Sequence, residues 1–170
     1  EYAIRHFYDD REGLFFFTSD LDPALIARKS EVHDTVMPAS ASSMALNLFR
    51  LGHLTGNSRY LDIAGKLLQR QMPLLISHPG SYTNWAKLLL WSSRDYYVIA
   101  VVGKSFKKGI EELRKTDITD VIYAGSERNA SLPVLENRYV RGKTMFYVCT
   151  HGTCKQPVDQ ASLVPDLISH

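Results

Sequence analysis

The spacing of apolar residues changes abruptly at Tyr96. Before this point, apolar side chains recur at the three- and four-residue spacing of a helix face. From Tyr96 to Val102 the sequence reads YYVIAVV, an unbroken run rich in β-branched residues, typical of a strand covered on both faces in a parallel sheet. The change predicts two parts divided near Arg94, with helices in residues 1–94 and a small α/β unit in residues 95–170.

The first part contains three helical patterns. Apolar residues lie on nearly every side of the segment 42–55, so this helix should be covered on more than one face. Gly56 suits the left-handed position after a helix and Asn57–Ser58 can cap the next one, which predicts a helical hairpin. Pro73 should end or kink the second helix, because proline lacks an amide hydrogen and clashes with the preceding turn. The third helical pattern places Tyr82, Trp85, Ala86, Leu89 and Leu90 on one face.

The second part begins with a β-α-β pattern. Gly103–Ser105 turns the chain out of the first strand, and Asp159 can cap a last helix that Pro165 delays or kinks. The expected fold class is α+β, with helical hairpins followed by a small three-stranded α/β unit. Its predicted elements are strands at 96–102, 121–123 and 144–149, and helices at 106–113 and after 159.

Composition and charge exclude several classes of protein. With 170 residues, 45% hydrophobic and 22% charged, the chain lies in the ordinary globular range rather than the disordered one. Its net charge of +2 is too small to indicate nucleic acid or an anionic membrane as a partner. No apolar run approaches the roughly 20 residues that cross a bilayer, and the N-terminus lacks a signal-peptide pattern. We therefore expect a cytoplasmic protein without a nucleic-acid or membrane partner.

The helical part is too apolar to be complete by itself. Helices that are apolar on more than one face cannot bury that surface against one another or against one small sheet. Tyr2 to Phe7 also reads as the tail of a helix. We therefore expect a truncated chain with missing helical neighbours, whose uncovered helical face favours homo-oligomerisation.

Several motifs together resemble one protein family. Gly13–Asp20 reads GLFFFTSD and is followed by Leu25–Lys29, Glu31, Asp34 and Pro38, and the helical hairpin carries ALNLFRLGHLTGNSRYLDIA. Near the end of the chain, CTHGTCKQPV holds two cysteines, a glutamine and a proline. In this order, and over essentially the whole chain, the motifs resemble the thioredoxin-domain-containing, spermatogenesis-associated protein family of bacteria and animals.

The resemblance implies a larger protein. In that family a thioredoxin-like domain precedes a helical toroid similar to the N-acylglucosamine 2-epimerases and six-hairpin glycosidases, so residues 1–94 would be the last hairpins of an α/α toroid. The implied partners are the missing thioredoxin-like domain, the missing toroid helices and a sugar ligand. One departure is Pro38–Ser42, which reads PASAS where Pro-Ser-Gly-Asn-Ser is expected. It removes an asparagine that could bind a polyol.

The candidate catalytic residues lie just before the first long helix. Glu31, His33 and Asp34 bring two carboxylates and an imidazole together beside Lys29, and related toroids place acid and base groups at their inner mouth. Histidine ordinarily titrates near neutral pH, so His33 suits a general acid or base that Asp34 could orient. The alternative is structural: Asp34 and Glu31 satisfy helix-end amides or pair with Arg28 and Lys29.

No cofactor is expected from the remaining motifs. Val102–Ser105 reads VGKS, like the end of a phosphate-binding loop, but the full pattern needs glycine where the chain has Val98. The acidic pairs Asp9–Asp10 and Asp20–Asp22 are interpreted as loop acids, because glycoside hydrolysis depends on a separation in space that sequence spacing does not give. Aromatic residues at helical or strand spacing are interpreted as core: Phe15, Phe16, Phe17, Tyr82, Trp85 and Trp91.

Cys149 and Cys154 allow four interpretations. A structural zinc site needs four ligands, and even with His151 only three are local, so no metal is expected. A disulfide is possible across the turn, although an intracellular setting disfavours a permanent one. A redox-responsive pair could work with the family's thioredoxin-like domain, but the spacing is not C-x-x-C. The last interpretation is two small packing residues in a tight turn.

Two functional hypotheses follow. The first is a carbohydrate-related enzyme of the epimerase or glycosidase type, with His33, Asp34 and Glu31 near its site. This chain alone would be inactive, because the site of a toroid is assembled from many helices. The second is a non-catalytic scaffold or redox-regulatory protein in which Cys149 and Cys154 respond to oxidants.

Overall fold

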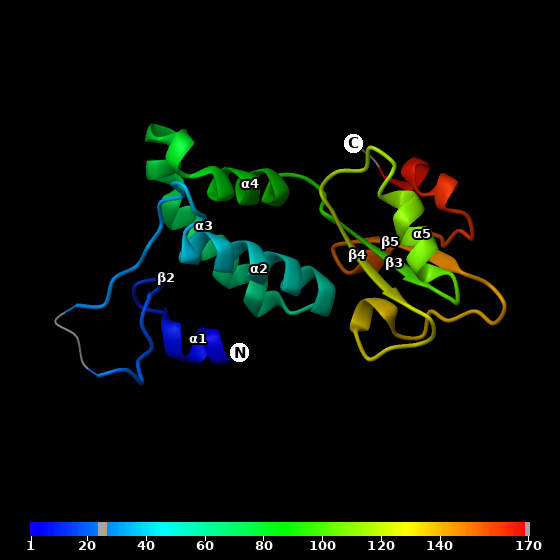
Figure 1. Cartoon of the computed structure of the whole chain (residues 1–170), viewed down its shortest axis with the longest axis horizontal. Coiled ribbons are helices and arrows are strands. Elements are labelled where there is room, and N and C mark those ends of the chain that lie inside the picture. Colours follow the sequence, from blue (N-terminus) through cyan, green and yellow to red (C-terminus); the bar gives the residue numbers. More distant parts are fainter. Residues whose placement is uncertain (24–26, 169–170) are drawn as a thin grey trace. The chain divides into compact units, whose positions relative to one another are not determined.

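The computed structural model describes residues 1–23 and 27–168 and forms two compact units (Figure 1). The first unit comprises Glu1–Phe49 and Ser58–Leu90, and the second comprises Arg50–Asn57 and the chain from Trp91 onward. Leu25 and Ile26, which belong to one of the motifs quoted above, lie outside the described residues. The chain combines helices with a mixed sheet and a small antiparallel sheet, so the predicted α+β class is confirmed.

Helices dominate the first unit. The first long helix begins at Ser40, two residues before the predicted start, and ends at Thr55. Gly56 follows it with a φ of 68°, in the left-handed region that glycine adopts without strain, and the next helix starts at Ser58. The predicted pair of helices with a turn at Gly56 is therefore confirmed. The elements are α1 (Tyr2–Phe7), β1 (Tyr8–Asp9), β2 (Leu14–Phe15), α2 (Ser40–Thr55), α3 (Ser58–Ser77), the 3₁₀ turn η1 (Pro79–Ser81) and α4 (Thr83–Ser92).

Pro73 lies inside α3 instead of ending it. The helix continues to Ser77, so of the two predicted outcomes an end at Pro73 is wrong, whereas a kink there stays a prediction. Proline has no N–H, so the carbonyl four residues before it has no hydrogen-bond donor within the helix. Pro73 is exposed, and on an exposed face water can bind such a carbonyl instead. Leu75, one turn beyond the main buried stripe of α3, is buried and holds the last turn of the helix to the core.

The core of the first unit contains three of the six aromatic residues that were predicted to be core, and a fourth, Trp91, is buried in the second unit. Trp85 is fully buried, and its indole N–H donates a 2.8 Å hydrogen bond to the carbonyl of Val32. Tyr82 and Phe15 are also buried. The core prediction does not hold for Phe16, which is only half-buried, or for Phe17, which follows the end of β2 at Phe15 and is 65% exposed. The aliphatic core comes from Ala45, Leu48, Ile63, Ala64, Leu67 and Leu88.

The second unit is built on a mixed sheet in the order β4-β3-β5-β6. β3 pairs in parallel with β4, and the helix α5 connects the two strands in the chain, so the predicted β-α-β unit is confirmed. β5 pairs antiparallel with the other edge of β3 and then forms a hairpin with β6. Within the described residues this sheet has four strands, so the three-strand prediction is wrong. The elements are β3 (Tyr97–Val102), α5 (Phe106–Leu113), β4 (Val121–Ser126), β5 (Met145–Thr150) and β6 (Thr153–Cys154).

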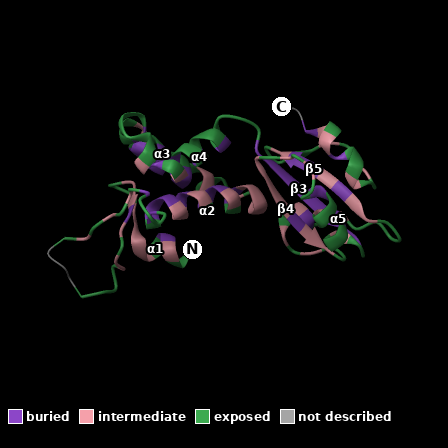
Figure 2. Cartoon of the chain, turned by 45° about the horizontal axis from the view of Figure 1, so that its top comes forward, coloured by how far each residue is buried: buried purple, intermediate pink, exposed green. Residues whose placement is uncertain are grey.

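All six residues of β3 are buried, as the unbroken apolar run predicted (Figure 2). Tyr97, Ile99 and Val101 belong to the core that also contains Leu113 of α5. Ala100 and Val102 pack on the other face, where the 3₁₀ turn η2 (Pro133–Leu135) supplies Leu135. The alternation of strand side chains therefore divides β3 between two cores.

Two glycines allow α5 to approach the sheet closely. A Cβ atom at Gly109 of α5 would lie 2.8 Å from the ring of Phe146 on β5. A Cβ atom at Gly125 of β4 would meet the ring of Phe106 and would lie 2.8 Å from Cδ1 of Ile110. Both distances are too short for a real contact, so glycine sets the separation between this helix and the sheet.

The last predicted helix is replaced by two 3₁₀ turns, η3 (Ala161–Leu163) and η4 (Pro165–Leu167). Pro165 begins the second turn, where its missing N–H costs nothing, and separates it from the first. Asp159 does not cap a helix but lies 3.4 Å from the ammonium group of Lys143. Val164 is nevertheless fully buried against the α5 side of the sheet. None of the helices in the described ranges is long and apolar enough to span a membrane.

Candidate functional sites

Asp34 is the most deeply buried of the predicted catalytic residues, and it lies where α2 and α4 begin. Its Oδ1 accepts hydrogen bonds from the backbone N–H of Ala39 (3.0 Å) and from the hydroxyl of Ser42. Its Oδ2 accepts a 2.8 Å hydrogen bond from the backbone N–H of Asn84. These contacts correspond to the helix-end alternative for Asp34, in which a carboxylate satisfies amides at helix starts.

Tyr82 is a buried aromatic residue that contacts the ring of His33 and is close enough to Asp34 to feel its charge. Burial raises the pKa of the Tyr82 phenol, and the negative charge of Asp34 acts in the same direction. The Tyr82 hydroxyl is buried and has no hydrogen-bond partner among the described residues. The ring centroids of His33 and Tyr82 are 5.1 Å apart, so the imidazole packs against a buried aromatic ring.

A cavity of about 510 Å³ collects the other predicted residues. Glu31 and His33 line it together with Lys29 and the exposed ring of Phe17, whereas Asp34 does not. We call it the Phe17 cavity. Among the described residues, its lining consists of Phe17, Thr18, Ala27, Lys29, Ser30, Glu31 and His33.

Polar groups in this lining have unused hydrogen-bonding capacity. The side chains of Lys29 and Glu31 are exposed and form no hydrogen bond or ion pair with other described residues. The hydroxyls of Thr18 and Ser30 are buried and make no hydrogen bond within the described part of the chain. The exposed side chains in the lining therefore offer one cation, one carboxylate and one imidazole to a ligand.

Arg28 makes hydrogen bonds that hold together the segments lining the Phe17 cavity. Its guanidinium donates to the carbonyls of Thr18 (2.5 Å) and His6 (3.1 Å), and it stacks 4.5 Å above the ring centroid of Phe16. The backbone N–H of Phe17 adds a 2.8 Å hydrogen bond to the carbonyl of Lys29. Arg28 therefore holds backbone carbonyls rather than the carboxylates of Glu31 or Asp34, which was the ion-pair alternative.

The two cysteines lie on either side of a tight hairpin. His151 and Gly152 connect β5 to β6, and both have positive φ angles, of 48° and 76°. Two consecutive residues with positive φ match the primed turns that join antiparallel strands with two-residue loops. This turn pairs Cys149 directly with Cys154 across the hairpin.

Strand pairing brings the two sulfurs together. The backbone N–H of Lys155 donates to the carbonyl of Val148 (2.9 Å), so the next pair along the ladder, Cys149 and Cys154, is of the non-hydrogen-bonded type. Side chains approach most closely in such pairs. The two Cα atoms are 3.9 Å apart, and the cysteines form a disulfide. Of the alternatives above, the two side chains are thus covalently joined rather than merely packed.

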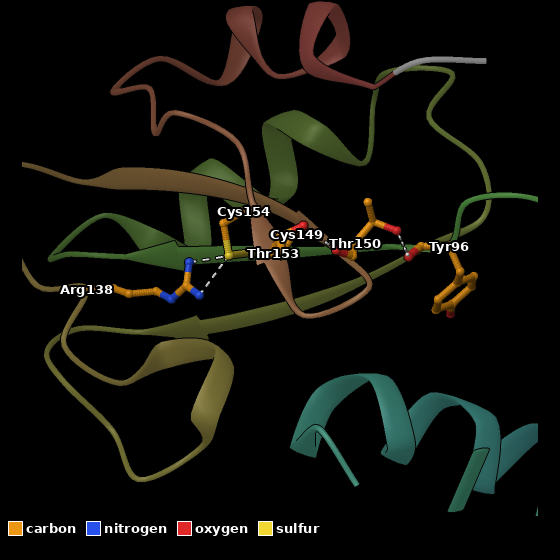
Figure 3. The surroundings of a disulfide bond; sticks show 6 residues. All are labelled: Tyr96, Arg138, Cys149, Thr150, Thr153 and Cys154. Carbon is orange, nitrogen blue, oxygen red and sulfur yellow. Dashed lines mark hydrogen bonds between the residues drawn. A yellow bond between two sulfur atoms is a disulfide. The ribbon is translucent and has the colours of Figure 1, made fainter. Parts of the chain in front are cut away.

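Arg138 contacts both sulfurs of the disulfide (Figure 3). One guanidinium nitrogen lies 3.3 Å from Sγ of Cys149 and the other lies 2.9 Å from Sγ of Cys154. The guanidinium also stacks 4.8 Å from the ring centroid of Tyr147, whose hydroxyl donates to the backbone carbonyl of Arg138 (2.7 Å). Burial lowers the pKa of Arg138 from its ordinary value, while Tyr147 opposes this shift.

The sequence predicted a role for Lys29, Glu31 and His33 of the Phe17 cavity and for both cysteines. It did not predict the residues that contact Asp34 and the disulfide from other parts of the chain. Asn84 and Arg138 were not identified, because neither belongs to a local motif with the group that it contacts. His151, considered as a zinc ligand, lies with Nε2 3.0 Å from Oδ1 of Asp95. The described residues include no group of three or more His, Cys, Asp or Glu side chains that could hold a metal ion.

Comparison with known proteins does not assign the chain. No protein-family model matches it, and no curated protein or solved structure matches it significantly.

Proposed function

We propose that this chain is the C-terminal part of a cytoplasmic, carbohydrate-related enzyme of the family it resembles, and that the Phe17 cavity receives the sugar. The observation that carries the proposal is the lining of that cavity, where an exposed aromatic ring faces the same space as a cation, a carboxylate and an imidazole. Aromatic faces and convergent polar groups are the usual components of a site for a small polar ligand.

The proposed roles follow from exposure and contacts. Glu31 and His33 act as the acid and base groups, because both line the cavity and are exposed to a ligand. Asp34 acts as a positioning residue, since its carboxylate is occupied by the starts of α2 and α4. Lys29, whose side chain is exposed in the cavity lining, binds ligand oxygens.

The exposed apolar surface of the helices supports the toroid part of the proposal. Large apolar side chains on α3 and α4 are exposed, although the same helices also carry a well-buried face. Neighbouring toroid helices in a longer protein, or a second copy of the chain, would cover them. The exposed residues are Leu74, Ile76, Leu89 and Leu90.

Binding to the 170-residue chain tests the proposal, because turnover would require the rest of the toroid. Isothermal titration with monosaccharides, disaccharides and sugar phosphates should detect a ligand for the wild-type chain. Phe17→Ala, Glu31→Gln and His33→Ala should each weaken it at least tenfold, whereas His78→Ala, an exposed histidine outside the cavity, should not. Absence of binding across the panel, or equal binding by all variants, would remove the carbohydrate proposal.

A second candidate is the redox-regulatory protein, and the Cys149–Cys154 disulfide favours it. If the protein is cytoplasmic, as proposed, the cell would reduce an ordinary structural disulfide, and cytosolic disulfides are usually transient or redox-sensing. Rapid acid quenching of cells followed by thiol alkylation should show mostly reduced cysteines that become oxidised on exposure to peroxide. A pair that stays in one state throughout would exclude this candidate.

A further inference from the structure

Arg138 occupies an unusual place for a cation. Its guanidinium is partly buried, and within the described residues it has no carboxylate partner, only two disulfide sulfurs and the face of Tyr147. A disulfide sulfur is a weak hydrogen-bond acceptor, so it compensates poorly for the hydration that a buried cation loses. The same two nitrogens would be well compensated by a thiolate, which carries a full negative charge.

We propose that Cys149, Cys154 and Arg138 form a thiol–disulfide exchange site whose substrates are dithiols, with Arg138 stabilising the thiolate that leaves. The inference rests on the redox candidate described above and adds to it the direction of attack and the residue that promotes it. Arg138 is a positioning residue in this scheme, because it forms no bond to the reductant.

Exposure selects the sulfur that is attacked. Cys154 is exposed on the edge strand β6, whereas Cys149 is 5% exposed on β5. A reductant thiolate can therefore reach Sγ of Cys154 and form a mixed disulfide with it. The bond between the two cysteines breaks, and its electron pair leaves on Sγ of Cys149, which lies 3.3 Å from a guanidinium nitrogen of Arg138. Stabilising the leaving thiolate accelerates exchange.

The second half of the reaction regenerates a free site. The second thiol of the reductant, as its thiolate, attacks the reductant sulfur that is bonded to Cys154. A disulfide forms between the two reductant sulfurs, the bond to Sγ of Cys154 breaks, and its electron pair leaves on Sγ of Cys154. The second guanidinium nitrogen lies 2.9 Å from this sulfur. The reductant closes into its own disulfide and gives up two protons and two electrons in total, and the protein retains two cysteines in thiol or thiolate form.

The rate and equilibrium of reduction by dithiothreitol test the role of Arg138. The cysteines of the native chain are alkylated after timed exposure and counted by mass spectrometry. Arg138→Met should slow reduction about tenfold and lower the equilibrium constant for reduction about tenfold, a change of about 30 mV. Arg138→Lys should lie between this variant and the wild type. Arg141→Met, which removes the same charge from a neighbouring exposed position, should match the wild type.

Two outcomes separate the inference from the redox candidate beneath it. A wild-type disulfide that resists dithiothreitol in the native state overturns both. A wild-type disulfide that is reduced, with Arg138→Met reduced equally fast, overturns only the role of Arg138. Peptide mapping of the wild-type chain, quenched during reaction with glutathione, tests the direction of attack even if Arg138→Met does not fold. The adduct should be on Cys154, and an adduct mainly on Cys149 would contradict the assignment.

Discussion

The carboxylate of Asp34 accepts a 2.8 Å hydrogen bond from the backbone N–H of Asn84, fifty positions later in the chain. The same carboxylate binds Ala39 and Ser42, so one buried side chain joins the start of α2 to the start of α4. His33 and Glu31, one and three positions before it, face the Phe17 cavity. The acid therefore joins two helix starts and directly follows the segment that lines the cavity.

Asp34→Asn should destabilise the chain by about 1 to 3 kcal/mol, because an amide nitrogen would replace one acceptor and face a buried donor. Urea unfolding followed by circular dichroism measures the difference. Glu31→Gln, at an exposed carboxylate in the same segment, should change the free energy of unfolding by less than about 0.5 kcal/mol. Equal stability of the two variants would show that the contacts of Asp34 do not matter.

Arg28→Met should loosen the wall of the Phe17 cavity. Methionine keeps an apolar stem near Phe16 but cannot donate to the carbonyls of His6 and Thr18. We expect a loss of about 1 to 2 kcal/mol in stability and faster hydrogen exchange at the amide of Phe17. Arg11→Met, at an exposed arginine, is the control. Unchanged exchange at Phe17 in the Arg28 variant would contradict the assignment.

Gly125→Ala should destabilise the chain by about 1 to 3 kcal/mol, because the new methyl group overlaps Phe106 and Ile110 where α5 rests on β4. Gly65→Ala is the matched control, since nothing lies within 4 Å of its Cβ position on α3. That change should be neutral or should stabilise the helix by up to about 1 kcal/mol. Thermal unfolding of both variants measures the difference, and a harmless Gly125→Ala would mean that the helix can shift away.

The stability of the chain should depend on the protonation of His53. Burial lowers the pKa of this side chain below its ordinary value of 6.5, and the charge of His151 adds to the shift. Below pH 6.5 the unfolded chain therefore binds a proton that the folded chain still excludes, so stability falls as the pH decreases through this window. His53→Gln should flatten the decrease in unfolding free energy measured between pH 7.5 and 5.5. If the slope is unchanged, the decrease in unfolding free energy comes from titratable groups other than His53.

Strong periodicity made most elements predictable. The unbroken run at Tyr97–Val102 is short and rich in β-branched residues, which favours a strand buried on both faces, and the structure contains that strand. Short elements were not predictable in the same way, because the two residues of β6 contain no period. The signal for that strand was instead His151-Gly152, since glycine next to one other residue tolerates the positive φ angles of a two-residue hairpin.

The contacts that assemble the candidate sites were hidden from the sequence for a different reason. Asp34 and Asn84 are in contact because two helices start at the same place. Arg138 contacts the cysteines from a loop eleven positions before Cys149. The spacing of residues within one segment carries no information on contacts between segments that are distant in the chain. Glu31 and His33 could be grouped because they are neighbours in the chain, but the separation of Asp34 from the cavity depends on which way each side chain is buried.

Because the disulfide lies within the β5–β6 hairpin, it restrains the chain very little. Cys149 and Cys154 are already held opposite each other by the turn and by the backbone ladder, and the bond closes a loop of only a few residues. It ties no distant segments together and encloses no other part of the sheet. Opening or closing it leaves the threading of the polypeptide unchanged, so the domain can reach its topology before either sulfur has reacted.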